Sequence, residues 1–95
     1  MESKLFTPVT FGPLTLRNRT IRSAAFESMC PGNAPSDMLL DYHRSVAAGG
    51  IGMTTVAYAA VTQSGLSFDR QLWMRPEIIP GLRRLTDAIH AEGAV

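Results

Sequence analysis

Cys30, His43, His90 and Glu27 are the side chains of this sequence that we consider as nucleophile, metal ligands or acid. Cys30 has no partner motif and lies in a turn-rich loop, which favours a free thiol over a nucleophile. His43 and His90 have no second histidine or cysteine at ligand spacing, so we expect both to be structural or exposed. Glu27 is interpreted as a solvated loop charge rather than an acid. These residues predict no metal site and no catalytic group within the chain.

Two other groups of residues suggest a ligand at first sight. Gly49, Gly50 and Gly52 are spaced like part of a dinucleotide-binding loop, but such a loop follows a strand and opens a helix. These glycines instead close a predicted helix and open a predicted strand, so we interpret them as a helix cap and a tight turn. Phe68 and Trp73 are expected to pack under a long loop rather than to contact a ligand.

The clearest sign of a site is a predicted strand, residues 20–26, that ends in small side chains. Ser23, Ala24 and Ala25 bury little apolar area before the bulky Phe26. One explanation is a helix packed closely on these positions, which composition alone favours. The other is a planar ligand whose ring edge bonds to main-chain amides at the carboxyl end of the strand. A second predicted strand also ends in small residues, at Ala57, Ala59 and Ala60. Two neighbouring strand ends of this kind favour a site.

The first half of the chain predicts a hairpin, a strand and a helix. Residues 5–17 alternate apolar and polar side chains on either side of Gly12-Pro13, as a short hairpin does. The strand over 20–26 leads into a loop with two prolines. Ser36 is a suitable N-cap for the helix that follows, and Gly49-Gly50 ends it.

The second half repeats the order of strand and helix. Residues 51–57 form a β-branched run of strand length, and a long segment then extends to Met74. Pro76 and Pro80 fit the start of a helix that Gly93 closes. Its apolar stripe consists of Ile78, Leu82, Leu85 and Ile89. Ala94-Val95 would begin a third strand.

Alternating strands and helices predict an α/β fold with a parallel sheet and right-handed crossovers. Parallel strands need cover on both faces, and two of them cannot close a barrel. The 95 residues therefore look like the front part of a larger domain.

Composition excludes several classes of partner. Nine basic and eight acidic residues give a net charge of +1, which favours neither nucleic acid nor an anionic membrane surface. The longest uncharged stretch, residues 45–68, is broken by polar residues and glycines, and the N-terminus has no apolar signal core. A single cysteine fits a reducing compartment. We expect a cytoplasmic protein.

Four segments taken together resemble the N-terminal part of the old yellow enzyme family. They are LFTPVTFGPLTLRNR, TIRSAAFE, HRSVAAGGIGMTTVAYAAVTQSG and RPEIIPGLRRLTDAIHAEGA, and they follow one another in the family's order. The resemblance covers almost the whole chain and includes the NADH:flavin oxidoreductase and 2,4-dienoyl-CoA reductase branch. It implies the hairpin and first two βα units of a TIM (β/α)8 barrel, with the hairpin at about 5–17 and the units at about 20–48 and 51–92.

The resemblance also implies a cofactor and a reaction. FMN would contact the main chain at Ser23, Ala24, Ala25 and Phe26 and would lie beside Ala57, with Tyr58 as the neighbouring match. NAD(P)H would serve as reductant, and the substrate would be an activated alkene such as an enone, or an enoyl or dienoyl compound. An iron-sulfur cluster or FAD would belong only to a longer parent protein.

The sequence departs from the family in two respects. Phe26 occupies a position where many members place a threonine or cysteine near the flavin, so tuning of the flavin by that side chain is not expected. A TIM barrel also needs about 250 residues. The family's proton donor and substrate contacts would fall beyond Val95, so no catalytic residue can be assigned.

Two alternatives remain. The chain could be a truncated, non-catalytic relative or an interaction fragment, with the remainder of a barrel or a second copy as its partner. It could also belong to another TIM-barrel enzyme whose small strand ends only pack against helices. In either case we expect residues 1–95 alone to fold poorly or to self-associate, because two parallel strands leave both edges unpaired.

Overall fold

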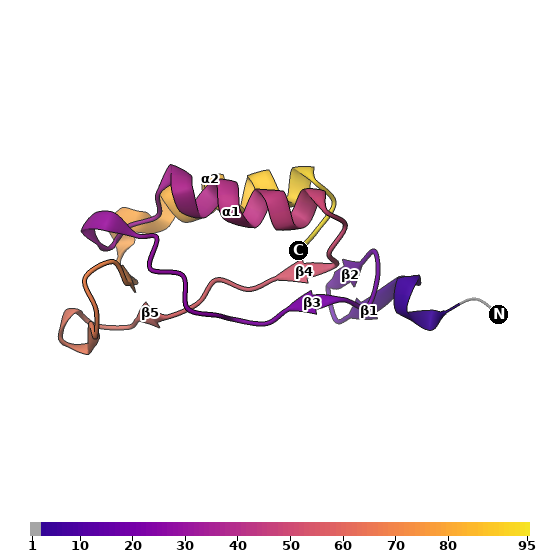
Figure 1. Ribbon diagram of the computed structural model, residues 1–95, viewed down its shortest axis with the longest axis horizontal. Helices are drawn as coiled ribbons and strands as arrows, with labels where there is room; N and C mark the ends of the chain where they lie inside the picture. Colours follow the sequence, from indigo (N-terminus) through magenta and orange to yellow (C-terminus); the bar gives the residue numbers. More distant parts are fainter. Residues whose placement is uncertain (1–2) are drawn as a thin grey trace.

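The computed structural model describes residues 3–95 and places two helices together on one face of a short parallel strand pair (Figure 1). The helices are α1 (Asp37–Ala48) and α2 (Ile79–Ala91), and the strands are β3 (Ile21–Arg22) and β4 (Met53–Thr54). The molecule is elongated, with extents of 51 × 24 × 22 Å. No helix of the described residues is both long enough and apolar enough to span a bilayer.

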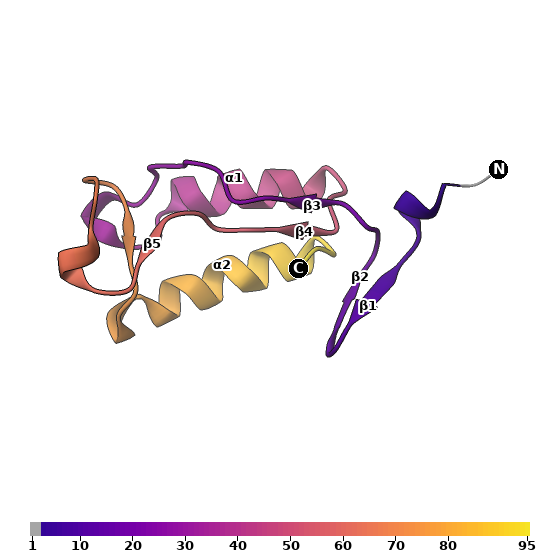
Figure 2. The ribbon, with the colours of Figure 1, turned by 90° about the horizontal axis from the view of Figure 1, so that it is seen from below.

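The predicted hairpin is present at one end of the molecule, where it projects away from the other elements (Figure 2). It consists of β1 (Val9–Phe11) and β2 (Leu14–Leu16), which pair antiparallel. Gly12 between them has φ +52°, a left-handed conformation that glycine adopts without strain.

The strands β3 and β4 are parallel as predicted, but they are shorter than the predicted segments. The ladder pairs Ile21 with Met53 and Arg22 with Thr54 and then stops. Beyond this point side chains take the place of the ladder: the Arg22 guanidinium donates to the Thr55 carbonyl at 3.0 Å. The free edge of β4 pairs with the end of the chain, since Val95 N donates to Gly52 O and Thr54 N to Val95 O. Val95 therefore bonds to β4 as a neighbouring strand would, although residues 94–95 are not themselves assigned as a strand.

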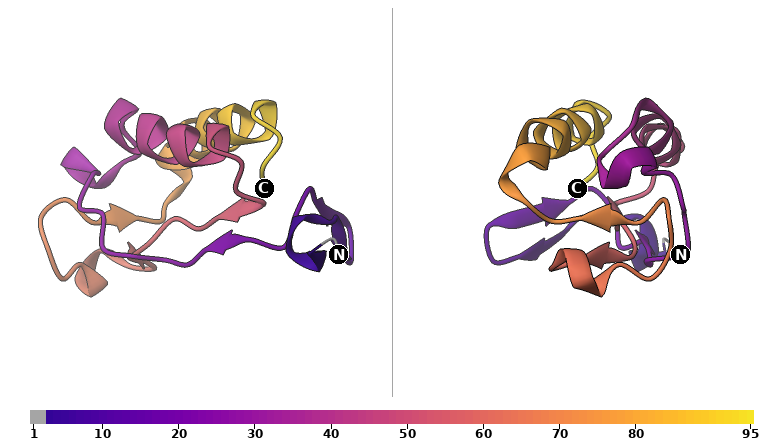
Figure 3. Two further views of the ribbon diagram at one scale, coloured as in Figure 1. Left: turned by 45° about the vertical axis from the view of Figure 1, so that its right-hand side comes forward. Right: turned by 90° about the vertical axis from the view of Figure 1, so that its left-hand side faces the viewer.

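A second parallel pair lies at the far end of the molecule and was not predicted. It consists of β5 (Ala59–Ala60) and β6 (Leu72–Trp73), with Ala59 opposite Leu72 (Figure 3). Each strand has only two residues, too few to show a period of two in the sequence.

Both helices begin and end as their sequences indicate. Ser36 caps α1, and its Oγ accepts a hydrogen bond from Leu39 N at 3.1 Å. A short 3-10 turn, Pro76–Ile78, leads into α2, and Gly93 follows it with φ +89°. Gly49 N donates to Ser45 O at the end of α1, so this glycine is a helix cap and not part of a dinucleotide loop.

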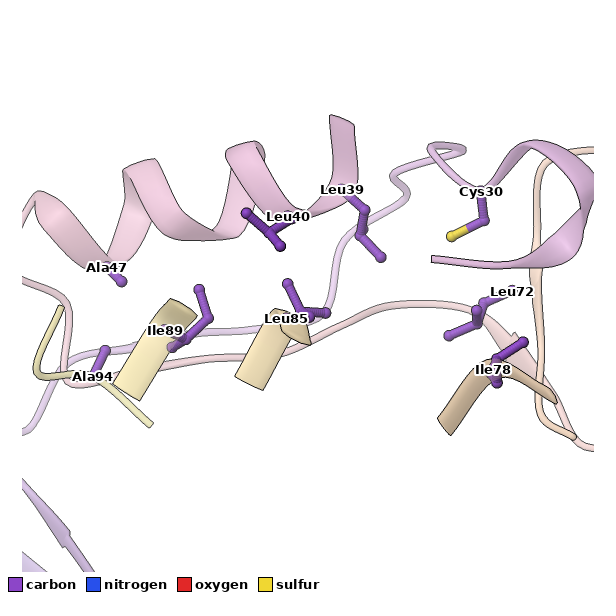
Figure 4. Packing of buried hydrophobic residues seen from close by; sticks show 9 residues of the cluster. All are labelled: Cys30, Leu39, Leu40, Ala47, Leu72, Ile78, Leu85, Ile89 and Ala94. Atoms are coloured by element: carbon purple, nitrogen blue, oxygen red, sulfur yellow. The ribbon is translucent and has the colours of Figure 1, made fainter. Parts of the chain in front are cut away.

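The core lies between the two helices and the strands (Figure 4). Its buried residues are Cys30, Leu39, Leu40, Ala47, Leu72, Ile78, Leu85, Ile89 and Ala94. The face of the strands opposite the helices has no helix over it among the described residues (Figures 1 and 3). Ile21, at 50% exposure, and Phe26, at 63%, are apolar residues left uncovered. The structure is thus a layer of helices on an open sheet and not a closed barrel.

Arg17, the residue after β2, joins the hairpin to the rest of the molecule. Its guanidinium donates to Glu92 O at 2.7 Å, to Ile51 O at 3.0 and 3.1 Å, and to Ala47 O. Ala47 and Glu92 lie at the carboxyl ends of α1 and α2, where carbonyls lack helical partners and a positive charge is stabilising. A single side chain therefore fixes both helix ends to the amino-terminal edge of β4.

Candidate functional site at the strand ends

The two strand ends with small residues lie at the same edge of the sheet, because β3 and β4 are parallel. Ser23, Ala24 and Ala25 are exposed, and Ala57 is 7% exposed. No helix of residues 3–95 packs on the first three positions. Among residues 3–95, therefore, no closely packed helix accounts for the small side chains at 23–25, and both explanations of them stay predictions.

The main chain at this edge suits a planar ring. Among the hydrogen bonds between backbone groups of the described residues, none involves the amide of Ala24, Ala25 or Phe26. Residues 24–26 are themselves exposed, and the side chains of residues 23–25 are small. A flat ligand could rest here and accept hydrogen bonds from the backbone, as FMN would require.

Three aromatic side chains gather beside these strand ends. Phe26, Tyr58 and Phe68 have ring centroids 4.9 to 5.9 Å apart, in tilted and edge-to-face arrangements. Tyr58 has φ +54°, an uncommon conformation for a residue with a side chain. Phe68 is half-buried, as predicted for a residue packed in the long segment that extends to Met74. Phe26 and Tyr58 are instead 63% and 55% exposed. The rings form an apolar rim at the edge where residues 23–26 end.

Glu27 is not a solvated loop charge, which corrects the prediction. Its side chain is 4% exposed and lies 3.2 Å from Arg22 Nη2 and 2.7 Å from His43 Nε2. The geometry to His43 is that of a close polar contact and not of a well-aligned hydrogen bond. The segment that contains Glu27 turns inward because Arg22 supplies a buried positive charge for its carboxylate. Composition did not reveal that this charge would be buried.

His43 is structural, one of the two outcomes predicted for it. It is fully buried, and its Nδ1 lies 2.7 Å from Thr54 Oγ1 on β4. Burial lowers the pKa of His43, and the charge of Arg22 acts in the same direction against the attraction of Glu27. His90 is exposed. In the part of the chain that the structure covers, no three His, Cys, Asp or Glu side chains are grouped to hold a metal ion.

Cys30 is a buried free thiol, as predicted. Burial, together with the charge of Glu27, raises the pKa of Cys30, which keeps the sulfur protonated and unreactive. Trp73 is half-buried and lies against the Arg75 guanidinium, whose carbon is 4.6 Å from the ring centroid.

A small cavity of about 70 Å³ lies between α2 and β4, and His43 and Thr54 are among its lining residues. Val56, Leu85, Ile89 and Val95 are among the residues that line it. It includes none of the residues predicted to contact a flavin, so the strand ends and not this cavity form the candidate site.

A family comparison agrees with this arrangement. Residues 4–95 match the sequence model of a family described as NADH:flavin oxidoreductase / NADH oxidase. The chain belongs to this family. The resemblance to old yellow enzymes is confirmed, and the family implies FMN as cofactor.

Similar proteins of this family are much longer than the chain. A 4,4'-dithiodibutanoate disulfide reductase of Rhodococcus erythropolis is 53% identical over 91 residues, which are 96% of this chain and 23% of that protein. A metal reductase of Desulforamulus reducens is 37% identical over 92 residues, 97% of this chain and 14% of the relative. The chain spans a quarter or less of these proteins.

Solved structures show the same partial match. A 2-naphthoyl-CoA reductase in complex with 2-naphthoyl-CoA superposes with a TM-score of 0.89 at 29% identity, over 96% of this chain and 14% of that one. Morphinone reductase in complex with tetrahydroNAD gives 0.83 at 21% identity, over 98% and 25%, and so supports the fold alone. These enzymes are TIM barrels, and the chain matches one part of each.

The interpretation of single residues missed Arg22, Glu27 and Tyr42 as a connected group. Arg22 Nη2 donates to Tyr42 Oη at 2.9 Å, and the guanidinium carbon lies 4.8 Å from the tyrosine ring centroid. The signal was present in RSAAFE, where two opposite charges stand on either side of an uncharged segment.

Proposed function

We propose that these residues form the hairpin and the first two βα units of an FMN-dependent TIM-barrel oxidoreductase, and that their strand ends form one wall of the flavin site. The proposal is supported chiefly by one observation: the exposed small segment 23–25 lies at the same sheet edge as Ala57. Active sites of TIM barrels lie at this carboxyl edge. The full-length activity is part of the proposal, because the chain covers a minor part of its relatives.

The residues of this chain would bind and orient the cofactor. Accessible amides of residues 24–26 would meet the ring edge, and Ala57 would leave room beside it. Phe26 would supply an apolar contact at the position where other family members place a hydrogen-bonding side chain that adjusts the reduction potential of the flavin. Bound FMN would supply hydride transfer from NAD(P)H to a carbonyl-activated alkene such as an enone or an enoyl compound.

The relative with 53% identity suggests a second substrate class. That protein is named for reduction of an organic disulfide, 4,4'-dithiodibutanoate. Reduction of a disulfide to two thiols consumes two electrons and two protons. NAD(P)H supplies the electrons with one proton, as a hydride, and solvent supplies the second proton. Assays of the complete enzyme should therefore compare an enone with this disulfide.

The proposal can be tested in a chimera in which residues 1–95 replace the matching part of the Rhodococcus erythropolis reductase. Identity of 53% makes the remaining barrel a suitable partner. We expect a folded, yellow protein whose flavin is identified by absorbance and mass spectrometry. A chimera that does not fold, or that folds without flavin, would contradict the proposal.

A pair of substitutions tests the location of the site. Ala24→Trp would place a large ring on the exposed strand end, and we expect at least about tenfold weaker FMN binding, or about 1.4 kcal/mol. Ala48→Trp makes the same change at an exposed position on α1 and should leave FMN binding unchanged. Equal FMN affinity in the two variants would show that the flavin does not lie on residues 23–25.

A non-catalytic interaction fragment is the second candidate. Figure 1 shows one face of the strands with no helix over it, and apolar residues such as Ile21 and Phe26 are exposed, which favours a partner. The DNA beyond codon 95 discriminates between the two: a frame that continues into further strands supports the enzyme, and an immediate stop supports the fragment.

A further inference from the structure

A buried charged cluster lies directly beneath the strand ends, and no step of the proposed function uses it. It consists of Arg22, Glu27 and His43, with side chains 15%, 4% and 0% exposed. Glu27 lies between the other two, 3.2 Å from Arg22 Nη2 and 2.7 Å from His43 Nε2. Charges buried this deeply are costly unless each one is paired, so their presence calls for an explanation.

The protonation of the cluster follows from its contacts. Arg22 is positive and Glu27, beside it, is its counter-charge. His43 is neutral at pH 7 because burial lowers its pKa. Its Nε2 lies 2.7 Å from the Glu27 carboxylate and its Nδ1 lies 2.7 Å from the Thr54 hydroxyl, so the ring contacts both the loop and β4. The cluster carries no net charge, and its bonds depend on the positions of all members.

The members of the cluster enclose the proposed flavin wall. Arg22 immediately precedes residues 23–26, and Glu27 immediately follows them. The ion pair therefore joins the two ends of this segment and closes it into a loop of fixed width. Without this pair the segment has no ladder and, at residues 24–26, no backbone hydrogen bond to hold it.

The same side chains connect the loop to β4 and α1. Arg22 Nη1 donates to Thr55 O at 3.0 Å, and its Nη2 donates to Tyr42 Oη at 2.9 Å. Glu27 Oε1 lies 3.4 Å from Ala57 N, at the long end of a hydrogen bond. Both proposed flavin contacts, residues 23–26 and Ala57, are thus held by one cluster.

We propose that the Arg22–Glu27–His43 cluster is a positioning device that fixes the main chain of residues 23–26 relative to Ala57, so that the two strand ends fit one planar cofactor. This inference rests on the proposed function. Arg22 and Glu27 are positioning residues and do not themselves touch the cofactor. A ring site must be held within fractions of an ångström by surrounding groups, and exposed loop residues cannot provide this alone.

Stability alone does not account for the cluster. A buried ion pair can often be replaced by apolar residues without loss of stability, so its retention is better explained by the geometry it imposes. Its balanced charge has a second consequence near a flavin. Loss of the Glu27 charge would leave Arg22 unpaired, and a positive charge nearby favours the electron-rich reduced ring.

The test uses Glu27→Gln in the chimera, with Glu77→Gln as matched control. Glu77 is 75% exposed and lies 4.0 Å from Arg75, so the control removes a carboxylate outside the cluster. For Glu27→Gln we expect FMN binding to weaken at least about tenfold and the flavin midpoint potential to rise. Binding is measured by fluorescence titration of the apoprotein and the potential by equilibration with a reference dye. The control should match the unmodified chimera in both.

Tyr42→Phe is a milder variant that keeps the proposal testable if Glu27→Gln does not fold. It removes only the hydroxyl that accepts from Arg22, and we expect FMN binding to weaken about two- to fivefold. Unchanged FMN affinity and potential in folded Glu27→Gln, or unchanged affinity in Tyr42→Phe, would overturn the inference even if the melting temperature fell. An unmodified chimera that lacks flavin would instead contradict the proposed function.

Discussion

The two ends of the β3–β4 pair are built in opposite ways. At the amino-terminal edge the backbone is closely packed: a Cβ on Gly52 would lie 2.5 Å from Asn18 O, and Arg17 binds the ends of both helices. At the carboxyl edge residues 23–25 are exposed, and a buried charged cluster in place of a ladder holds the loop. One end therefore fixes the fold, while the other leaves main chain accessible.

This difference separates stability from ligand binding. Substitutions at the amino-terminal edge should lower the free energy of unfolding without changing the flavin spectrum of the protein that folds. Substitutions of the exposed residues at the carboxyl edge, as distinct from the buried cluster beneath them, should change flavin binding or potential at small cost to stability. All variants that test this separation are made in the chimera.

Gly52→Ala should have the largest effect, at the closely packed edge. Its Cβ would lie 2.5 Å from Asn18 O and 2.9 Å from Thr20 O, and backbone atoms cannot give way easily. We expect a loss of more than about 3 kcal/mol, measured by chemical unfolding. Gly65→Ala is the control, since its nearest contact would be 3.5 Å. A Gly52→Ala protein as stable as this control would show that the edge tolerates expansion.

Arg17→Ala should be the next most damaging substitution. It leaves the carbonyls of Ala47, Ile51 and Glu92 without their charged donor. We expect about 2–4 kcal/mol of destabilisation by chemical unfolding, with the flavin absorption of the folded protein unchanged. Arg19→Ala removes two long contacts of 3.3 Å and should cost less than about 0.5 kcal/mol. Equal losses in the two variants would mean that Arg17 does not hold the helix ends together.

The sequence was informative where local chemistry decides the structure. Ser36 and Gly49 bound α1 as predicted because capping depends on neighbouring residues. The hairpin followed from Gly12 and the alternation around it. The strands β5 and β6 were missed because two-residue strands form through long-range pairing, which leaves no periodic pattern.

The candidate site was predictable only in part. Small residues at 23–25 pointed to the strand end, and the structure leaves them exposed. The opposite charges of RSAAFE indicate a possible pair, but not its burial, because the burial of Glu27 also depends on His43 from α1. Local sequence does not show which charges will share a buried site, and an isolated glutamate in a loop is most often solvated.

Stability should fall in mild acid because of His43, a group at the base of the carboxyl edge. Its folded pKa lies below the ordinary value of 6.5, since burial disfavours the charged form. At a pH between the folded pKa of His43 and 6.5, the unfolded chain binds more protons than the folded chain. The free energy of unfolding therefore decreases as pH falls below 6.5. Chemical unfolding at a series of pH values measures this slope. Glu27 and Arg22, the charged groups that face the ring, are themselves paired.

His43→Gln provides the comparison for this pH effect. It removes the titrating ring, and the slope between pH 6.5 and the lower folded pKa should diminish relative to the unmodified protein. The same slope in both proteins would assign the acid sensitivity to other groups. His90→Gln, which replaces the exposed histidine of α2, is the matched control.

Phe26→Thr should have the smallest effect on stability and a measurable one on the flavin. Phe26 is 63% exposed, and its ring is edge-to-face with Tyr58 and tilted against Phe68, so we expect a loss of less than about 1 kcal/mol. The introduced hydroxyl can donate a hydrogen bond to the ring, which favours the reduced cofactor and raises the midpoint potential. Phe26→Leu keeps an apolar side chain and should leave the potential unchanged. If both variants have the same potential, this side chain does not face the flavin, and only the main chain of the strand end can contact it.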